Sequence, residues 1–261
     1  MHQFWQDLAT PDFDGIDPES TIAILPLAAV EQHGHHLPLA TDAIINTGLI
    51  NGLLQRPHGT ARVLVLPAMT IGHSLEHVDY AGTLTIAAET LLASWIDVGR
   101  SVARAGVSKL ILLNTHGGQT SLVQLAALRL RVEEGMMVVR ANYFAFGSPP
   151  GLFAADELKH GIHGGEMETS LLMHLRPDLV RREALADFTG LPRQLAAKNK
   201  VFGAEKPVGF GWMSQDLHPG GVVGNAASAD AGRGKQLLDY LVGQLALLIE
   251  EVAATPLETL R

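Results

Sequence analysis

Histidine and carboxylate side chains stand close together in the motif EQHGHH of this chain. Glu31 and His33 are separated by one residue, and residues spaced in this way point to the same side of an extended segment. Asp42 follows a proline-containing turn at a predicted helix start, from which its carboxylate could return to the same place and bridge two cations. The alternative is a surface loop with scattered polar residues, which His35, His36 and the preceding apolar strand disfavour.

A second motif, NTHGG, follows the apolar run KLILL. Asn114 and His116 are polar residues at the end of a predicted strand, where core packing explains them poorly. Gly117 and Gly118 let the backbone approach a ligand closely and turn into the next helix. The motif therefore indicates a ligand-binding turn, and the alternative is a strand-to-helix turn whose histidine is exposed and idle.

The third motif, HGGEMETS, opens a predicted helix. Glu166 falls in the first turn of that helix, where an acidic residue complements the helix dipole. Glu168 is harder to explain in this way, because the following LLMHL already supplies the apolar face. We expect His163 to be a general acid/base and Glu168 to be a metal ligand; the alternative is a capped and solvated helix start.

His73, Glu76 and His77 form a looser group in a predicted loop, and any of them could line a pocket. We expect Ser74 and His77, together with Gly117 and Gly118, to contact substrate. The other histidines that stand apart from the motifs are expected to be structural or exposed: His58, His160, His174 and His218.

The elements that must position these motifs alternate between apolar strand-like runs and amphipathic helices. Strands are predicted in the first half of Thr21–Val30, in Ala61–Gly72, in VSKLILLN and in MMVVRANYF. Helices are predicted in Asp42–Leu54, Glu89–Ala105, Ser121–Glu134, Glu166–His174 and Asp230–Val252. Asp42 is the predicted N-cap of its helix, and residues 185–224 are predicted to be irregular. This alternation predicts one α/β domain, residues 1–261, with a mostly parallel sheet between two helix layers. Ligands bind beyond the carboxyl ends of such strands, where two of the motifs lie.

Composition narrows the class of protein. The formal net charge is −8 and no lysine- or arginine-rich run occurs, so a nucleic-acid partner is not expected. The chain has no cysteine, so any metal must use histidine and carboxylate ligands. We expect a cytoplasmic protein, because the lack of cysteine suits a reducing compartment and the N-terminus does not read as a signal peptide. No uncharged run reaches the roughly 18 residues of a membrane span.

The motifs together resemble the creatininase family of metal-dependent amidohydrolases. The matching segments are LPLAAVEQHGHHLPLATD, HSLEHVDYAGTLTI, NTHGGQ and HGGEMETSLLMHLRPDLV, which occur in the family's order over residues 21–180. The later segment GGVVGNAASADAGRGKQL is also similar to the family.

The resemblance implies a three-layer α/β/α sandwich that carries two divalent metal ions per subunit, which are zinc, manganese or iron. It also implies a homo-oligomer, commonly a hexamer, and a small-molecule amide substrate. By motif position, the implied metal ligands are Glu31, His33, Asp42, His116 and Glu168, with Asp42 bridging. His163 matches a histidine implicated in proton transfer, which makes His163 and Glu168 the expected catalytic pair.

This sequence departs from creatinine amidohydrolases at two places. They resemble H-Y-E after the strand, where this chain has His116, Gly117 and Gly118, so the acidic residue two positions after the histidine is missing. The two tryptophans that close over creatinine also have no counterpart, because none lies between Trp95 and Trp212. We therefore expect a substrate other than creatinine.

The resulting expectation is a hydrolase for amide C–N bonds other than peptide bonds. A hydroxide that bridges the two metals, formed because they lower the pKa of water to roughly 7, would attack the carbonyl carbon. His163 would then protonate the leaving nitrogen. The alternatives are a peptidase for a cofactor-precursor peptide, a hydrolase of a keto-sugar or cyclic substrate with the same two-metal site, and a non-catalytic binding module.

Overall fold

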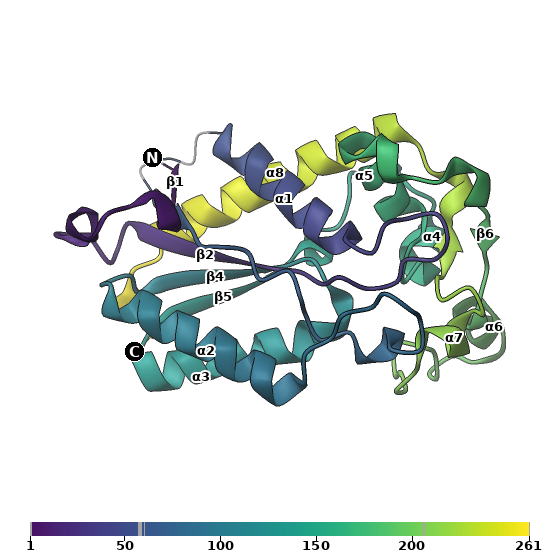
Figure 1. Ribbon diagram of the computed structural model, residues 1–261, viewed down its shortest axis with the longest axis horizontal. Coiled ribbons are helices and arrows are strands. Elements are labelled where there is room, and N and C mark those ends of the chain that lie inside the picture. The colour runs from purple at the N-terminus through teal and green to yellow at the C-terminus, as the bar shows by residue number, and fades with distance from the viewer. Residues whose placement is uncertain (1, 57–58, 60, 206, 261) are drawn as a thin grey trace.

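Five parallel strands form the central sheet of the computed structural model, which describes residues 2–56, 59, 61–205 and 207–260. The strands are β1 (His2–Phe4), β2 (Thr21–Leu27), β3 (Arg62–Val65), β4 (Lys109–Asn114) and β5 (Met137–Asn142). Their order is β1-β3-β2-β4-β5, and each neighbouring pair is parallel. Their carboxyl ends therefore share one edge, which lies at the opposite end of the molecule from the chain termini (Figure 1).

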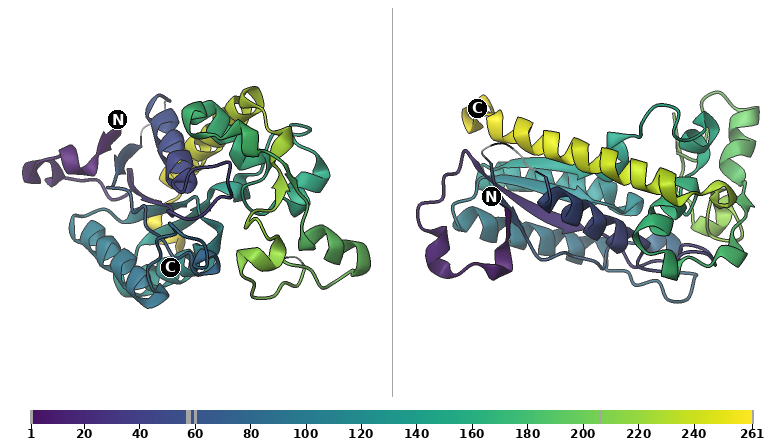
Figure 2. Two further views of the ribbon diagram at one scale, coloured as in Figure 1. Left: turned by 45° about the vertical axis from the view of Figure 1, so that its right-hand side comes forward. Right: turned by 90° about the horizontal axis from the view of Figure 1, so that it is seen from above.

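Helices cover both faces of the sheet, as Figures 1 and 2 show. One layer contains α1 (Thr41–Leu54), α5 (Glu166–Leu175) and α8 (Ala231–Ala254), and the other contains α2 (Ala88–Arg104) and α3 (Thr120–Glu134). Along β2, Ile22 and Ile24 pack into the core with α1, α5 and α8, whereas Ala23 and Leu25 pack into the core with α2 and α3. Strands buried on both faces are continuous apolar runs for this reason. The predicted three-layer α/β/α sandwich is confirmed.

Short elements gather at the carboxyl edge of the sheet. They are α4 (Ala155–His160), α6 (Leu191–Lys198), α7 (Ser214–Leu217) and the antiparallel pair β6 (Asp187–Phe188) and β7 (Gly224–Asn225). The segment 185–224, predicted to be irregular, thus contains two helices and takes part in a small second sheet (Figure 2). None of the helices in the described part of the chain has the length and apolar content needed to cross a membrane.

Two predicted boundaries are wrong. The apolar run Ala61–Gly72 forms a continuous strand only as far as Val65; Pro67 has no N–H to donate, and beyond it the segment pairs with β2 only through an isolated bridge between Met69 and Leu27. Asp42 is not the N-cap of α1; Ala40 holds that position, and Asp42 lies in the first turn. The Asp42 carboxylate instead faces the histidines described below. The prediction for His58 lies outside the described residues.

A buried lysine joins the end of the last helix to the sheet. The Lys109 ammonium, at the start of β4, donates to the carbonyl oxygens of Val252, Ala253, Thr255 and Glu19, at 2.7–3.2 Å. The last carbonyls of a helix have no partner within the helix, so this ammonium satisfies groups that would otherwise be buried and unpaired.

Candidate metal centre

The polar residues that follow β2 and β4 meet those that begin α1 and α5. Glu31 and His33 lie in the loop after β2, and His116 follows β4. Asp42 and Glu168 lie in the first turns of α1 and α5. All five side chains that were predicted as metal ligands are therefore brought to the carboxyl edge of the sheet, as parallel topology leads one to expect.

Four of these side chains converge inside the protein. Glu31, His33, Asp42 and His116 are each at most 2% exposed. His116 Nδ1 lies 3.2 Å from Glu31 Oε1 and 3.2 Å from Asp42 Oδ2. His33 Nε2 lies 3.4 Å from Asp42 Oδ1, on the other side of the same carboxylate. The four residues form one buried polar cluster.

Asp42 belongs to two groups of potential ligands. Glu31, Asp42 and His116 form one group, and His33, Asp42 and Glu168 form the other; within each, the ligand atoms lie within 4.8 Å of one another. The two oxygens of Asp42 are divided between the groups, since Oδ2 faces His116 and Oδ1 faces His33. A carboxylate in this position can bridge two cations.

Backbone carbonyl groups orient the imidazole rings. His116 Nε2–H donates to the carbonyl oxygen of His73 at 2.8 Å, and His33 Nδ1–H donates to that of Glu31 at 3.1 Å. A carbonyl only accepts, so the proton of each neutral ring sits on that nitrogen and the other nitrogen has a free lone pair. These lone pairs face Asp42, and metal-binding histidines are fixed by the same kind of outer hydrogen bond.

His163 and His77 differ in which nitrogen carries the proton. His163 Nε2–H donates to the carbonyl oxygen of Gln32 at 2.7 Å, which leaves Nδ1, 3.8 Å from Glu31 Oε1, free to accept a proton. The amide nitrogen of Gln32 donates to both Gly221 O and His77 Nδ1, so Nε2 of His77 carries the hydrogen. This Nε2 lies 3.5 Å from Glu31 Oε1, which makes His77 a donor in the site rather than a ligand.

The pKa shifts in the cluster favour ionised carboxylates and protonated histidines, as expected for a site that holds positive charge. Burial opposes ionisation of Glu31, but the charge of His116 outweighs it and lowers the pKa of Glu31 to about 2. Burial also opposes ionisation of Asp42, but the hydrogen bond from His116 outweighs it and lowers the Asp42 pKa. Burial disfavours a charged His33, but the hydrogen bond to Asp42 outweighs it and raises the pKa to about 9. Without metal, protons on the imidazoles take the place of cations.

The residues fit a pair of divalent cations. When the imidazoles are neutral, Glu31 Oε2, His33 Nε2 and Asp42 Oδ2 are buried and have no hydrogen-bond partner. Buried polar atoms are nearly always paired, so orphaned ligand atoms that point at one another need an explanation. A cation in each of the two groups would satisfy all three atoms with ligands that zinc and manganese accept.

Neighbouring side chains hold Glu168 at the edge of the cluster. Its Oε2 accepts from the backbone N–H of Gly164 at 2.6 Å, and its Oε1 accepts from the Tyr143 hydroxyl at 3.3 Å. His33 Nε2 lies 4.0 Å from Glu168 Oε2. The sequence interpretation missed Tyr143, although its place directly after β5 is the same signal that identified His116 after β4.

The predicted substrate contacts lie at different depths. Ser74 is buried, and its hydroxyl lies 3.4 Å from His116 Nε2. Gly117 and Gly118 form an exposed turn beside the cluster. Glu76, which was placed only in the loose loop group, extends its carboxylate to 3.7 Å from His116 Nε2.

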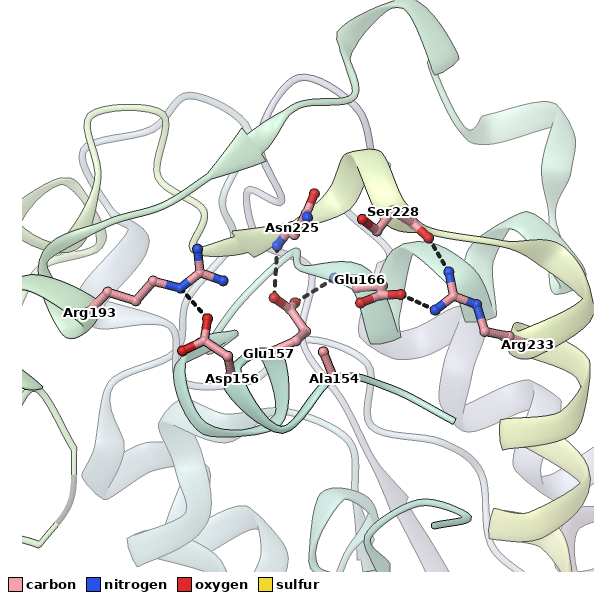
Figure 3. Close-up of a pocket in the computed structure, with 8 residues that line it drawn as sticks. All are labelled: Ala154, Asp156, Glu157, Glu166, Arg193, Asn225, Ser228 and Arg233. Atoms are coloured by element: carbon pink, nitrogen blue, oxygen red, sulfur yellow. Dashed lines mark hydrogen bonds and ion pairs between the residues drawn. The ribbon is translucent and has the colours of Figure 1, made fainter. Parts of the chain in front are cut away.

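A separate hollow of about 400 Å³ lies beside the start of α5, and none of the candidate ligands lines it (Figure 3). Its charged groups are paired with one another: Arg193 with Asp156, and Arg233 with Glu166. The buried Glu157 carboxylate accepts from the backbone N–H groups of Glu166 and Asn225, at 2.8 and 2.9 Å. These hydrogen bonds fix the start of α5, the helix that carries Glu168. The residues around the hollow therefore support the metal centre and do not form a second metal site.

A family model described as Creatininase: Creatinine amidohydrolase matches residues 6–249 of the chain. The chain belongs to the creatininase family. The resemblance that the four motifs predicted is therefore confirmed, and the match covers every residue of the cluster.

Three relatives of this creatininase-family chain act on different substrates, by their names. The mycofactocin precursor peptide peptidase of Mycobacterium ulcerans is 31% identical over 224 residues, which cover 84% of this chain and 80% of that protein. The creatinine amidohydrolase of Pseudomonas putida is 29% identical over 182 residues, or 64% of this chain and 68% of that protein. The 3-dehydro-scyllo-inosose hydrolase of Thermotoga maritima is 24% identical over 247 residues, or 88% and 77%.

Solved creatininases share the fold. A creatininase mutant in which phenylalanine replaces a tryptophan has a TM-score of 0.75 at 25% identity, over 97% of this chain and 99% of the other. Two more, each 24% identical over 97% of this chain, are a mutant of Zn–Zn type and a manganese form. They cover 98% and 99% of those chains, with TM-scores of 0.74 and 0.75.

Proposed function

We propose that this creatininase-family chain is a metal-dependent hydrolase that cleaves an amide C–N bond in a substrate other than creatinine. The observation that carries the proposal is the division of the Asp42 carboxylate between two groups of ligand atoms, with imidazole lone pairs facing it from both sides. The three relatives, whose names all describe hydrolytic enzymes, support the reaction class.

Two cations would be held by side chains from four segments. Glu31, Asp42 and His116 would hold one, and His33, Asp42 and Glu168 the other. When bound, divalent zinc, manganese or iron lowers the pKa of a water molecule towards neutrality and polarises the carbonyl group of an amide. Zn–Zn and manganese forms of solved creatininases support this choice of metals.

The chain's own residues would move the proton. Burial and the nearby charge of His33 lower the pKa of His163, so the ring is neutral near pH 7. Its Nδ1 faces the cluster with a free lone pair, so this atom would accept a proton from the attacking water and return it to the leaving nitrogen. The backbone carbonyl oxygen of Gln32 holds the His163 ring, so the orientation of Nδ1 does not depend on the substrate.

The tryptophans of this chain give no support for creatinine as substrate. Trp95 lies on α2 and is buried in the core. Trp212 packs in a small apolar cluster with Leu217 and Val223, and its indole N–H donates to Glu205. An aromatic lid over a flat heterocycle would need such rings beside the cations.

A peptide substrate is the second candidate, and the rim of the centre favours it. Leu75 and Val78 flank Glu76 and His77 in sequence and are exposed, as is Leu39, whose carbonyl oxygen accepts from Glu31 N–H. An exposed apolar rim of this kind suits the side chains of a peptide better than it suits a small polar amide. The name of the mycobacterial relative, at 31% identity, supports the same reading.

We also propose that the whole chain is one domain and that it assembles as a cytoplasmic homohexamer. Leu125, Leu128 and Val132 stand three and four residues apart on α3 and are exposed, so they form an apolar stripe that a neighbouring subunit could cover. Light scattering on the purified protein tests the size of the assembly, and a monomer at all concentrations would reject it.

Metal analysis followed by a substrate panel tests the proposed function. Protein purified without chelator should contain two divalent cations per chain. The metal-loaded protein should then release amine from at least one substrate in a panel of small amides, formamides and peptides that can be cleaved near their C-terminus. Release of product only from cyclic ketones would replace the amide assignment, and a metal-free protein without turnover on any substrate would reject the enzyme.

A further inference from the structure

The loop after β3 sends a carboxylate into the metal centre. Glu76 lies in the 3-10 turn Leu75–His77, and its side chain is 14% exposed. Its Oε1 lies 3.7 Å from His116 Nε2 and 3.9 Å from His77 Nε2. Carboxylate oxygens of Glu31 and Glu76 also lie within 4.8 Å of each other. Glu76 is therefore next to the group formed by Glu31, Asp42 and His116.

The same carboxylate occupies the space beside Gly118. A Cβ built on Gly118 would overlap Glu76 Oε1, and it would lie 2.7 Å from both Glu76 Cδ and His116 Nε2. Gly118 is not among the glycines with a positive φ, so its backbone conformation does not itself require glycine. A Cβ at this position would instead displace the Glu76 carboxylate from where it lies. A side chain at position 118 and the Glu76 carboxylate compete for one place.

The first cation would have room for a further carboxylate. Glu31, Asp42 and His116 would provide three protein ligands and the attacking water a fourth, which is enough for zinc, whereas manganese takes more ligands, largely oxygens. Glu76 comes from a turn at the surface, and a small movement of its terminal carboxylate towards Glu31 adds a fourth protein ligand.

We propose that Glu76 is a ligand of the cation held by Glu31, Asp42 and His116, and that it replaces the acidic side chain missing two positions after His116. The inference rests on the proposed two-metal centre and deepens it. It also explains why two features of the sequence occur together: glycine at 118, and glutamate directly before His77. The site then has an acidic ligand from each of four segments: those of Glu31, Asp42, Glu76 and Glu168.

Metal binding by Glu76→Gln tests the assignment without using turnover. Chelator-stripped protein is titrated with Mn²⁺ in a calorimeter, with Glu89→Gln, at an exposed acidic residue of α2, as the matched control. Wild type and the control should bind two cations. In Glu76→Gln one cation should weaken by more than the roughly 10- to 100-fold that an outer-shell change costs, while the other keeps its affinity.

A second variant reaches the same ligand from the other side. Gly118→Ala keeps every carboxylate in the chain but places a methyl group where Glu76 Oε1 lies, so the same cation should weaken. Wild-type affinity for both cations in both variants would overturn the assignment while leaving the proposed function intact. Failure of the wild type to bind two cations would instead reject the two-metal centre itself.

Discussion

Replacing Asp42 by asparagine tests whether one carboxylate serves two metal sites. Oδ1 faces His33 at 3.4 Å and Oδ2 faces His116 at 3.2 Å, so each site uses one oxygen and shares the negative charge. In Asp42→Asn one of these atoms becomes an NH₂ group, which cannot bind a cation, and the charge is lost from both sites. Both cations should therefore weaken. His33→Gln, which alters one group only, should weaken a single cation.

The size of the effect follows from binding linkage. A ligand at about 100 times its dissociation constant stabilises the folded state by about 2.7 kcal/mol, so two independent cations contribute about 5.4 kcal/mol. One kcal/mol raises the melting temperature by roughly 2–4 °C in a domain of about this size. Mn²⁺ should thus raise the melting temperature of the wild type by about 10–20 °C. The rise should be about half of that in His33→Gln and close to zero in Asp42→Asn.

Differential scanning calorimetry with and without Mn²⁺ measures these shifts directly. Asp97→Asn, at an exposed carboxylate of α2, is the matched control and should keep the full rise. The reasoning would be refuted if Asp42→Asn kept half of the wild-type rise, because the carboxylate would then serve one site. An unchanged rise in His33→Gln would equally remove His33 from the ligands.

Three further predictions follow from the same contacts. His163→Gln should retain two cations by elemental analysis but lose turnover by roughly 10²- to 10⁴-fold, the usual contribution of a general acid/base; a loss of metal would make it a ligand instead. In urea titrations, the metal-free protein should lose stability as the pH rises from 6.5 to about 9. The pKa of His33 is raised to about 9 on folding, so its stabilising proton is lost over that range. Saturation with Mn²⁺ should remove this pH dependence. Lys109→Met should lower the free energy of unfolding by about 2–4 kcal/mol, since several buried carbonyls lose their donor; exposed Lys235→Met should change it by less than about 0.5 kcal/mol.

The sheet and its helix layers could be predicted because local patterns determine them. Strands such as β2 and β4 are buried on both faces and are therefore apolar between their ends, which the sequence displays directly. The ends of the strands were harder to predict from the sequence, because β3 ends at Val65 while the apolar composition continues to Ile71. The edge strand β1 contains three residues, His2–Phe4, too few for a periodic pattern.

The grouping of the site residues could also be predicted, but their protonation could not. Each ligand candidate stands beside a strand end or a helix start, and the topology brings those points together. The role of His77 as a donor instead depends on Gln32, whose amide nitrogen is held by the carbonyl oxygen of Gly221. That contact joins residues 189 positions apart, and no local pattern announces it.

Glu76 and Gly118 show why a missing motif residue is weak evidence for a missing function. A cation requires a carboxylate at a point in space, and the chain can bring one there from any segment whose backbone passes nearby. His116 is followed by glycines, which on sequence alone indicates a loss of acidic character. In three dimensions the absence of a side chain at 118 is what makes room for the Glu76 carboxylate. The two positions should therefore change together: an acidic residue at 118 removes the need for Glu76, and any side chain at 118 displaces the carboxylate of Glu76 from the place it occupies here.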